Sequence, residues 1–146
     1  MSLEKWVELG WLKREPTSPN EIKSLLSIVN RGLADAKVQA ISVDRRFISA
    51  FNGGLTAATV ALRASGCRAA TQGGHHVRTI KSLEFTMQAD AKLIQKLKVF
   101  NNKRNKSSYD VAGAVSEQEL QSIMKVGDEL QREVKAWLQQ AHPELL

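Results

Sequence analysis

The chain has 146 residues, of which 42% are hydrophobic and 25% are charged, and this composition excludes an intrinsically disordered protein. Its formal net charge of +6 favours contact with polyanions such as nucleic acid. A lone cysteine excludes an internal disulfide, and no segment approaches the roughly 18 consecutive apolar residues that a membrane span requires. We therefore expect a cytoplasmic protein that forms one domain over residues 1–146, with no membrane segment, metal or cofactor.

Two helices are predicted near the N-terminus. The first, from Leu3 to about Lys13, carries apolar residues at three-residue steps, namely Trp6, Leu9 and Leu12. The second follows Ser18, a natural N-cap, with Pro19 at the first helical position and Glu21 placed to complete a capping box. It should end near Gln39, and it presents one apolar face made of Ile22, Leu25, Leu26, Val29 and Leu33.

The third predicted helix begins after the N-cap Ser42 and ends near Ser65. Its apolar positions have helical spacing and are Phe47, Phe51, Leu55, Ala58 and Leu62. Gly53 and Gly54 in its middle could bend it or admit a neighbouring backbone closely. Arg45 and Arg46 lie in the first turn, where the helix dipole disfavours cations, so their placement suggests a ligand or a cross-chain partner.

The second half of the chain is also predicted to be helical. After a loop over 67–74, one helix runs from about His76 to Met87, and another begins near Ala89 and carries Leu93, Leu97 and Phe100 in register. A loop over 109–115 follows, and Ser116 with Glu119 forms a capping box for the last helix. No strand-like alternation competes with these patterns. The sequence therefore predicts an all-α, up-and-down bundle of about five helices.

The segment 92–109 is strongly basic. It holds no acidic residue and contains Lys92, Lys96, Lys98, Lys103, Arg104 and Lys106. Because Arg104 follows Phe100 by four residues, helical spacing points it toward the packed side, where a guanidinium needs a partner. Asn101 and Asn105 share a neighbouring face and offer further hydrogen bonds. The lysines of this segment either form a solvated helix face or contact RNA.

Three segments together resemble the HEPN family. They are an Arg45-Arg46-Phe47 helix that ends in Ala64-Ser65-Gly66, then Gly74-His75-His76, and finally Arg104-Asn105-Lys106-Ser107-Ser108-Tyr109-Asp110. The resemblance spans roughly Glu21 to Leu138. It implies a four-helix core, a homodimer, and a minimal nucleotidyltransferase as partner in a prokaryotic toxin–antitoxin or stress and defence system. Active members of the family cleave RNA without metal, using an arginine, a neighbouring polar residue and a histidine.

The motif positions of that family fall on Arg104, Asn105 and Tyr109, and tyrosine stands where the histidine is expected. Tyrosine has an unperturbed pKa of about 10, so it exchanges protons poorly near neutral pH. The resemblance therefore implies a module that binds RNA, a nucleotide or a protein partner and lacks efficient nuclease activity. The residues expected to contact the ligand are Lys98, Lys103, Arg104, Lys106, Arg45, Arg46 and His76.

Other interpretations of the same residues stay open. In one, the chain is a metal-independent endoribonuclease in which Arg104 stabilises the developing charge and Tyr109 replaces the histidine. In another, it is a non-enzymatic helical interaction domain, and Arg104, Asn105 and Tyr109 form a structural network. Adjacent histidines on a helix point about 100° apart, so His75 and His76 cannot grip one metal ion together. Without a positioned base, Cys67 is expected to be inert.

Overall fold

The computed structural model describes residues 1–71, 73–109 and 112–146, and over 106–109 it describes the backbone alone. The fold is predominantly helical, as the sequence predicts. The helices are α1 (Leu3–Glu8), α2 (Pro19–Asp35), α3 (Val43–Ala64), α4 (His75–Lys81), α5 (Leu83–Thr86), α6 (Ala91–Tyr109), α7 (Glu117–Ala141) and a final 3₁₀ turn, η1 (Pro143–Leu145). Two short strands, β1 (Leu12–Arg14) and β2 (Cys67–Ala69), pair with each other.

Serine side chains begin three of the long helices, as predicted. The hydroxyls of Ser18, Ser42 and Ser116 each accept a hydrogen bond from the backbone N–H three residues later. At Ser116 the capping box is complete, because the Glu119 side chain also accepts from the Ser116 N–H. At Ser18 the predicted box is wrong, since the Glu21 carboxylate turns instead to Thr17 and Arg63.

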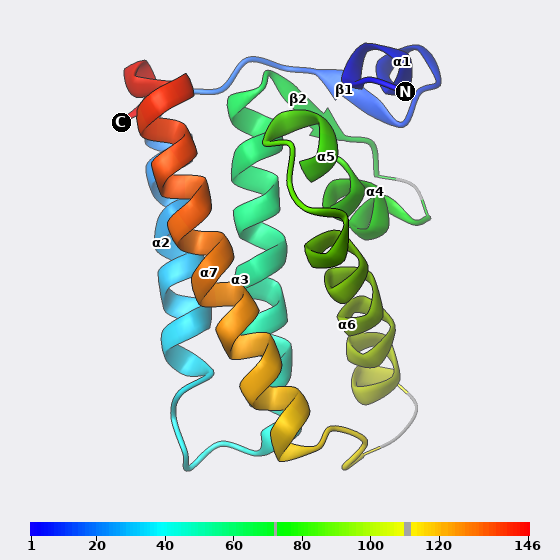
Figure 1. Ribbon diagram of the computed structural model, residues 1–146, viewed down its shortest axis with the longest axis vertical. Coiled ribbons are helices and arrows are strands. Elements are labelled where there is room, and N and C mark those ends of the chain that lie inside the picture. The colour runs from blue at the N-terminus through cyan, green and yellow to red at the C-terminus, as the bar shows by residue number, and fades with distance from the viewer. Residues whose placement is uncertain (72, 110–111) are drawn as a thin grey trace.

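Helix α3 is the centre of the molecule. Figure 1 shows α2 and α7 on one side of it and α4, α5 and α6 on the other, and α3 contacts all of them. Its side chains are buried around most of its circumference, and Phe47 and Phe51 are fully buried. Each buried phenylalanine stabilises the fold by about 2 kcal/mol. A helix enclosed in this way has to be built from apolar and small residues, which explains its many alanines.

The backbones of α2 and α3 come very close together. A Cβ added at Gly32 would lie 3.0 Å from the Ser49 carbonyl oxygen and 3.4 Å from the Cα of Gly53. A Cβ added at Gly53 would lie 3.1 Å from the Leu33 side chain. Gly53 therefore admits a neighbouring backbone, which is one of the two roles predicted for the glycine pair at 53–54, and the pair does not interrupt the helix.

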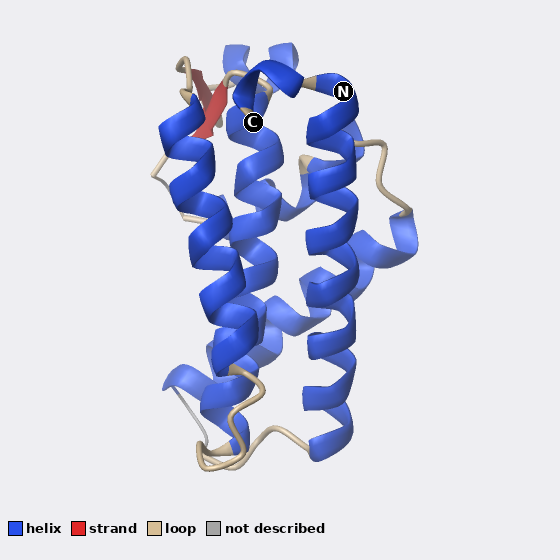
Figure 2. Ribbon diagram, turned by 90° about the vertical axis from the view of Figure 1, so that its left-hand side faces the viewer, coloured by secondary structure: helices blue, strands red, loops and turns tan. Residues whose placement is uncertain are grey.

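The N-terminal segment departs from the prediction. Helix α1 ends at Glu8 instead of continuing to about Lys13, because Gly10 takes a left-handed conformation (φ +78°) and turns the chain. Residues Leu12–Arg14 then pair antiparallel with Cys67–Ala69, part of the segment predicted to be a loop (Figure 2). Three-residue strands are too short to show an alternating pattern, so the expectation of no strand was wrong.

The remaining boundaries shift by a few residues. Helix α2 ends at Asp35 instead of near Gln39, and the helix predicted from His76 to Met87 begins at His75 and is divided at Ser82 into α4 and α5. Helix α6 continues to Tyr109, which was expected to begin a loop. The following connection is held by Asp44 of α3, whose carboxylate accepts hydrogen bonds from the backbone N–H groups of Gly113 and Val115.

Candidate functional site

Helix α6 carries the basic segment along almost its whole length. Its packed face begins with Leu97 and Phe100, both buried, and the Phe100 ring meets Phe47 of α3 edge to face at 5.8 Å. One step further along the same face come Asn101, which is only 4% exposed, and Arg104, which is half-buried. The apolar face of this helix therefore ends in polar side chains that still point toward the bundle.

Asn101, Arg104 and Asn105 form a polar group that we call the α6 site. Arg104 Nη1 donates a hydrogen bond to Asn105 Oδ1 at 3.4 Å. Arg104 Nε and Asn101 Oδ1 are buried, and neither has a hydrogen-bond partner among the described residues. Buried polar atoms are nearly always hydrogen-bonded, so such a donor and acceptor call for a partner beyond the described residues, such as water, a ligand or a second subunit.

Lys103 lies beside the α6 site but faces another way. Its ammonium forms an ion pair of 3.3 Å with Glu119 at the start of α7. The pKa of Glu119 lies below its usual range, first because the backbone N–H of Ser116 donates to the carboxylate and also because of Lys103. This lysine therefore ties α6 to α7. Lys98, also predicted to contact the ligand, is half-buried and precedes Asn101 by about one turn on the same face of α6.

Two histidines on α4 lie near the α6 site. The rings of His75 and His76 meet at 4.2 Å between centroids. The pKa of His76 is lowered from its ordinary value of 6.5, first by burial and then by the charges of His75 and Arg104. The Arg104 guanidinium is therefore within electrostatic range of His76, although 28 positions separate them in the sequence. A neutral imidazole can accept a proton or a hydrogen bond at neutral pH.

His75 and His76 also line a cleft of about 270 Å³ between α2, α3, β2 and α4. Its wall combines hydroxyl groups of threonines with apolar side chains, and two arginines, Arg63 and Arg68, border it. Every guanidinium nitrogen of Arg63 already has a partner within the chain. The α4 histidines thus border this cleft, and His76 is also within electrostatic range of Arg104.

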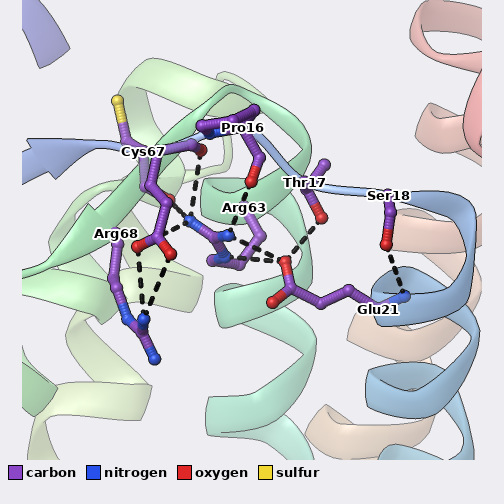
Figure 3. A network of polar contacts seen from close by, with 8 residues as sticks. Pro16, Thr17, Ser18, Glu21, Arg63, Cys67 and Arg68 are labelled. Atoms are coloured by element: carbon purple, nitrogen blue, oxygen red, sulfur yellow. Dashed lines mark hydrogen bonds and ion pairs between the residues drawn. The ribbon is translucent and has the colours of Figure 1, made fainter.

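Arg63, near the C-terminal end of α3, is the most completely satisfied cation in the described structure (Figure 3). Its Nε and Nη2 contact the Glu21 carboxylate at 2.9 and 2.8 Å. The remaining hydrogens point to the carbonyl oxygens of Glu15, Pro16 and Cys67 at 3.2 to 3.3 Å. The N-terminal segment, α2, α3 and β2 therefore meet at one guanidinium, whose side chain is 6% exposed.

The chemistry around Arg63 affects two neighbours. The pKa of Glu21 is lowered, first by the hydrogen bond from Thr17 and also by Arg63. Burial raises the pKa of the Cys67 thiol, although Arg14 and Arg63 act against this effect. A buried thiol held in its protonated form is a poor nucleophile, in agreement with the inert role expected for Cys67. Among the described residues, no group of three His, Cys, Asp or Glu side chains is arranged to hold a metal ion.

The two arginines predicted as contacts at the start of α3 have separate environments. Arg46 is buried, and its Nε donates to the Ala36 carbonyl oxygen at the end of α2, at 2.8 Å. The position of Arg46 in the first turn of α3 suggested a ligand or a second chain as its partner, and this hydrogen bond within the chain partly explains that position. Arg45 is exposed, and its side chain forms no ion pair with a described residue.

The structure thus brings together only some of the predicted contact residues. Arg104, Asn105 and His76 lie in one region, whereas Lys103 and Arg46 are directed to α7 and α2. The side chains of Lys106 and Tyr109 lie outside the described residues, so the expected contact between Tyr109 and Arg104 stays a prediction.

Sequence reasoning underestimated two residues of this region. Asn101 was assigned to a face beside Asn105, yet it is buried, and a signal for this was available because it follows Leu97 by four residues. The approach of His76 to Arg104 had no sequence signal, since it depends on how α4 packs against α6. The structure therefore adds a buried amide and an imidazole to the region of Arg104.

Comparison with known proteins gives no further guide: no family model, curated protein or solved structure matches the chain. Within the described segments, no helix has the length and apolar character needed to cross a lipid bilayer.

Proposed function

We propose that this chain is a HEPN-like module that binds RNA through the α6 site, with Arg104 as the main phosphate contact. One observation carries the proposal. The guanidinium of Arg104 is held at the packed face of α6 with a buried Nε that has no partner among the described residues. A phosphate oxygen satisfies such a donor well, because arginine forms short, charge-assisted and often bidentate hydrogen bonds with phosphate.

The surroundings of Arg104 support an anionic ligand. No described carboxylate forms an ion pair with Arg104, whereas the neighbouring Lys103 is neutralised by Glu119. Asn101 and Asn105 add amide groups that can hydrogen-bond to a sugar or a base. Lys98 and Lys106 would add sequence-independent attraction to the phosphate backbone.

The resemblance also supplies the proposed partners. We expect the chain to act as a homodimer in the cytoplasm, together with a minimal nucleotidyltransferase, as part of a toxin–antitoxin or stress and defence system. A second subunit packed over the end of α6 would cover the unpartnered buried atoms. Sedimentation of the purified protein over a range of concentrations tests the dimer, and a monomer throughout would remove this part of the proposal.

RNA binding is tested by fluorescence anisotropy with a labelled oligouridylate and a labelled RNA hairpin over a series of salt concentrations. We expect affinity to fall steeply with salt, because phosphate contacts release counterions. Arg104→Ala should weaken binding by about tenfold and lower the slope of log affinity against log salt by about one.

Two matched variants separate geometry from charge. Arg104→Lys keeps the charge but removes the planar fork, so it should recover little of the lost affinity. Lys96→Gln removes one charge from an exposed position of the same helix and should have a much smaller effect. If Arg104→Ala and Lys96→Gln weaken binding equally, the attraction is only general, and the α6 site is not the contact. If the chain binds no RNA and instead forms a stoichiometric complex with a single protein, it is an interaction domain.

A second candidate, a metal-independent endoribonuclease, is favoured by the approach of His76 to Arg104. The lowered pKa of His76 keeps its imidazole neutral at pH 7, as a general base requires. Tyr109 occupies the position of the motif histidine, and His76 would then supply the imidazole that the motif lacks. Slow RNA cleavage that persists in EDTA and is lost in both His76→Gln and Arg104→Ala would establish this activity, and equal residual cleavage in the variants would indicate a contaminant.

A further inference from the structure

A second polar cleft lies on the other side of α3 from α4 and α6. It measures about 520 Å³ and is formed where the end of α2, the first turn of α3 and the first half of α7 meet. Its charged lining consists of four cationic and two acidic side chains, namely Lys37, Arg46, Lys125, Arg132, Asp128 and Glu129. A cleft of this size accommodates a small phosphorylated ligand or a nucleotide unit of a longer chain.

Arg46 gives this cleft a fixed cation. Its side chain is more than nine-tenths buried, with 8% of the residue exposed. The hydrogen bond from Nε to the Ala36 carbonyl holds one edge of the guanidinium. Neither Nη nitrogen forms a hydrogen bond or ion pair with any residue that the structure describes, and Arg46 lines the cleft. The outer edge of the guanidinium thus keeps its donors available.

The other charges of the cleft do not neutralise Arg46. Lys37 pairs with Asp128 at 3.1 Å, so these two side chains compensate each other. Lys125 and Arg132 are exposed on α7, and Glu129 between them is the remaining acid. The balance is positive, and the buried cation has a rigid, planar donor edge. Such an edge can bind two oxygens of a phosphate group at once, and the positive balance of the lining favours an anion of high charge.

We propose that this cleft, which we call the Arg46 cleft, is a binding site for a phosphate group, with Arg46 as its anchor and Lys125 and Arg132 as flexible contacts. The phosphate belongs either to an RNA backbone or to a free phosphorylated compound, because both present the same oxygens. The proposal is independent of the α6 site, since it uses different residues on a different pair of helices.

The experiment is isothermal titration calorimetry of the full chain with inorganic pyrophosphate and, separately, with a short oligouridylate. We expect the double variant Lys125→Gln/Arg132→Gln to bind pyrophosphate about tenfold more weakly than the unchanged protein. The double variant Lys23→Gln/Lys135→Gln makes the same change of charge at exposed positions outside the cleft and should bind as the unchanged protein does. Arg104→Ala should also keep its affinity for pyrophosphate.

Arg46→Lys tests the anchor while keeping its charge. It loses the planar fork, so we expect weaker binding with an unchanged helical circular dichroism spectrum. If this variant does not fold, the surface double variant still decides the question. In the Arg104→Ala protein, whose α6 site lacks its main phosphate contact, tighter binding of the oligouridylate than of pyrophosphate assigns the phosphate to RNA, and the reverse order assigns it to a free compound. Absence of binding by both probes, or equal loss in the two double variants, would overturn the proposal.

Discussion

Arg63 and Arg104 are both directed into the helical bundle, and their surroundings are opposite. Arg63 donates to a carboxylate and three carbonyl oxygens, so all its nitrogens have partners. Arg104 donates to one exposed amide, and its buried Nε has no described partner. A guanidinium whose donors all have partners cannot bind a ligand as well, whereas one with a free buried donor is stabilised when a ligand accepts a hydrogen bond from it. Arg63 therefore serves stability, and the missing partner of Arg104 supports the recognition role that we propose for it.

The difference follows from where each arginine lies on its helix. Arg63 is on α3, the enclosed central helix, where the N-terminal segment and β2 bring main-chain oxygens to it. Arg104 is near the end of α6, a helix at the side of the bundle that contacts α3, α4 and α5. A charge buried inside a bundle therefore requires a complete set of partners within the protein, whereas a charge at the side of a bundle can be paired by an external ligand.

The largest expected effect is the loss of Arg63. Arg63→Met leaves Glu21 and three carbonyl oxygens without their donor, so we expect the free energy of unfolding to fall by roughly 3 kcal/mol. Urea unfolding followed by circular dichroism measures it. Arg31→Met, at an exposed position of α2, is the matched control and should change stability by less than about 0.5 kcal/mol. Equal effects of the two variants would remove Arg63 from its structural role.

Arg104→Met should show the reverse pattern. Because Arg104 has few partners to abandon, we expect the free energy of unfolding to change by less than about 1 kcal/mol, while RNA affinity falls about tenfold. Urea unfolding and anisotropy on the same sample make the comparison direct. A loss of stability as large as that of Arg63→Met would mean that Arg104 is also structural.

The Arg63 network should also appear in the dependence of stability on pH. The folded pKa of Glu21 is lowered, so its contribution is present above its ordinary value of 4.5 and is lost as the pH falls through the folded pKa. Glu21 is 39% exposed, so we expect about 1 kcal/mol or less. We would measure the free energy of unfolding from pH 6 to pH 3, about the range over which carboxylates titrate. Its dependence on pH should be weaker for Glu21→Gln than for the unchanged protein. An unchanged slope would show that the ion pair between Arg63 and Glu21 does not contribute to stability.

The smallest effect concerns His76 beside Arg104. Because the folded state lowers its pKa, the unfolded chain takes up the proton first, so stability should decrease slightly as the pH falls below 6.5. His76→Gln should remove this decrease, and Arg104→Met should reduce it because one opposing charge is gone. Thermal unfolding at a series of pH values measures both. A slope unaffected by Arg104→Met would contradict the proximity of the two side chains.

The features that depend on local sequence were predictable. The serine caps and the apolar faces of α2, α3 and α7 follow from residues a few positions apart, and they place most of the core. The β1–β2 pair was not predictable, because each strand has three residues and is stabilised by a partner more than 50 positions away.

For the candidate site, the sequence predicted the direction of Arg104 and its neighbour Asn105, but neither the burial of Asn101 nor the approach of His76 to Arg104. Helical spacing from Phe100 was enough to turn Arg104 toward the bundle. The nearby His76 and the complete coordination of Arg63 depend on packing between helices that are distant in sequence. One clue to Arg63 was available: the many alanines of α3 indicate an enclosed helix, and an arginine there has to be paired.

The glycine contact between α2 and α3 bears on the order in which the molecule assembles. These two helices are consecutive in the chain and touch at Gly32 and Gly53, so they can form a hairpin from local contacts alone. Helix α7 must return from far along the chain to pack against α3 on the same side as α2. Closing that long loop has the larger entropic cost, so docking of α7 onto a preformed α2–α3 hairpin is the step we expect to limit the folding rate.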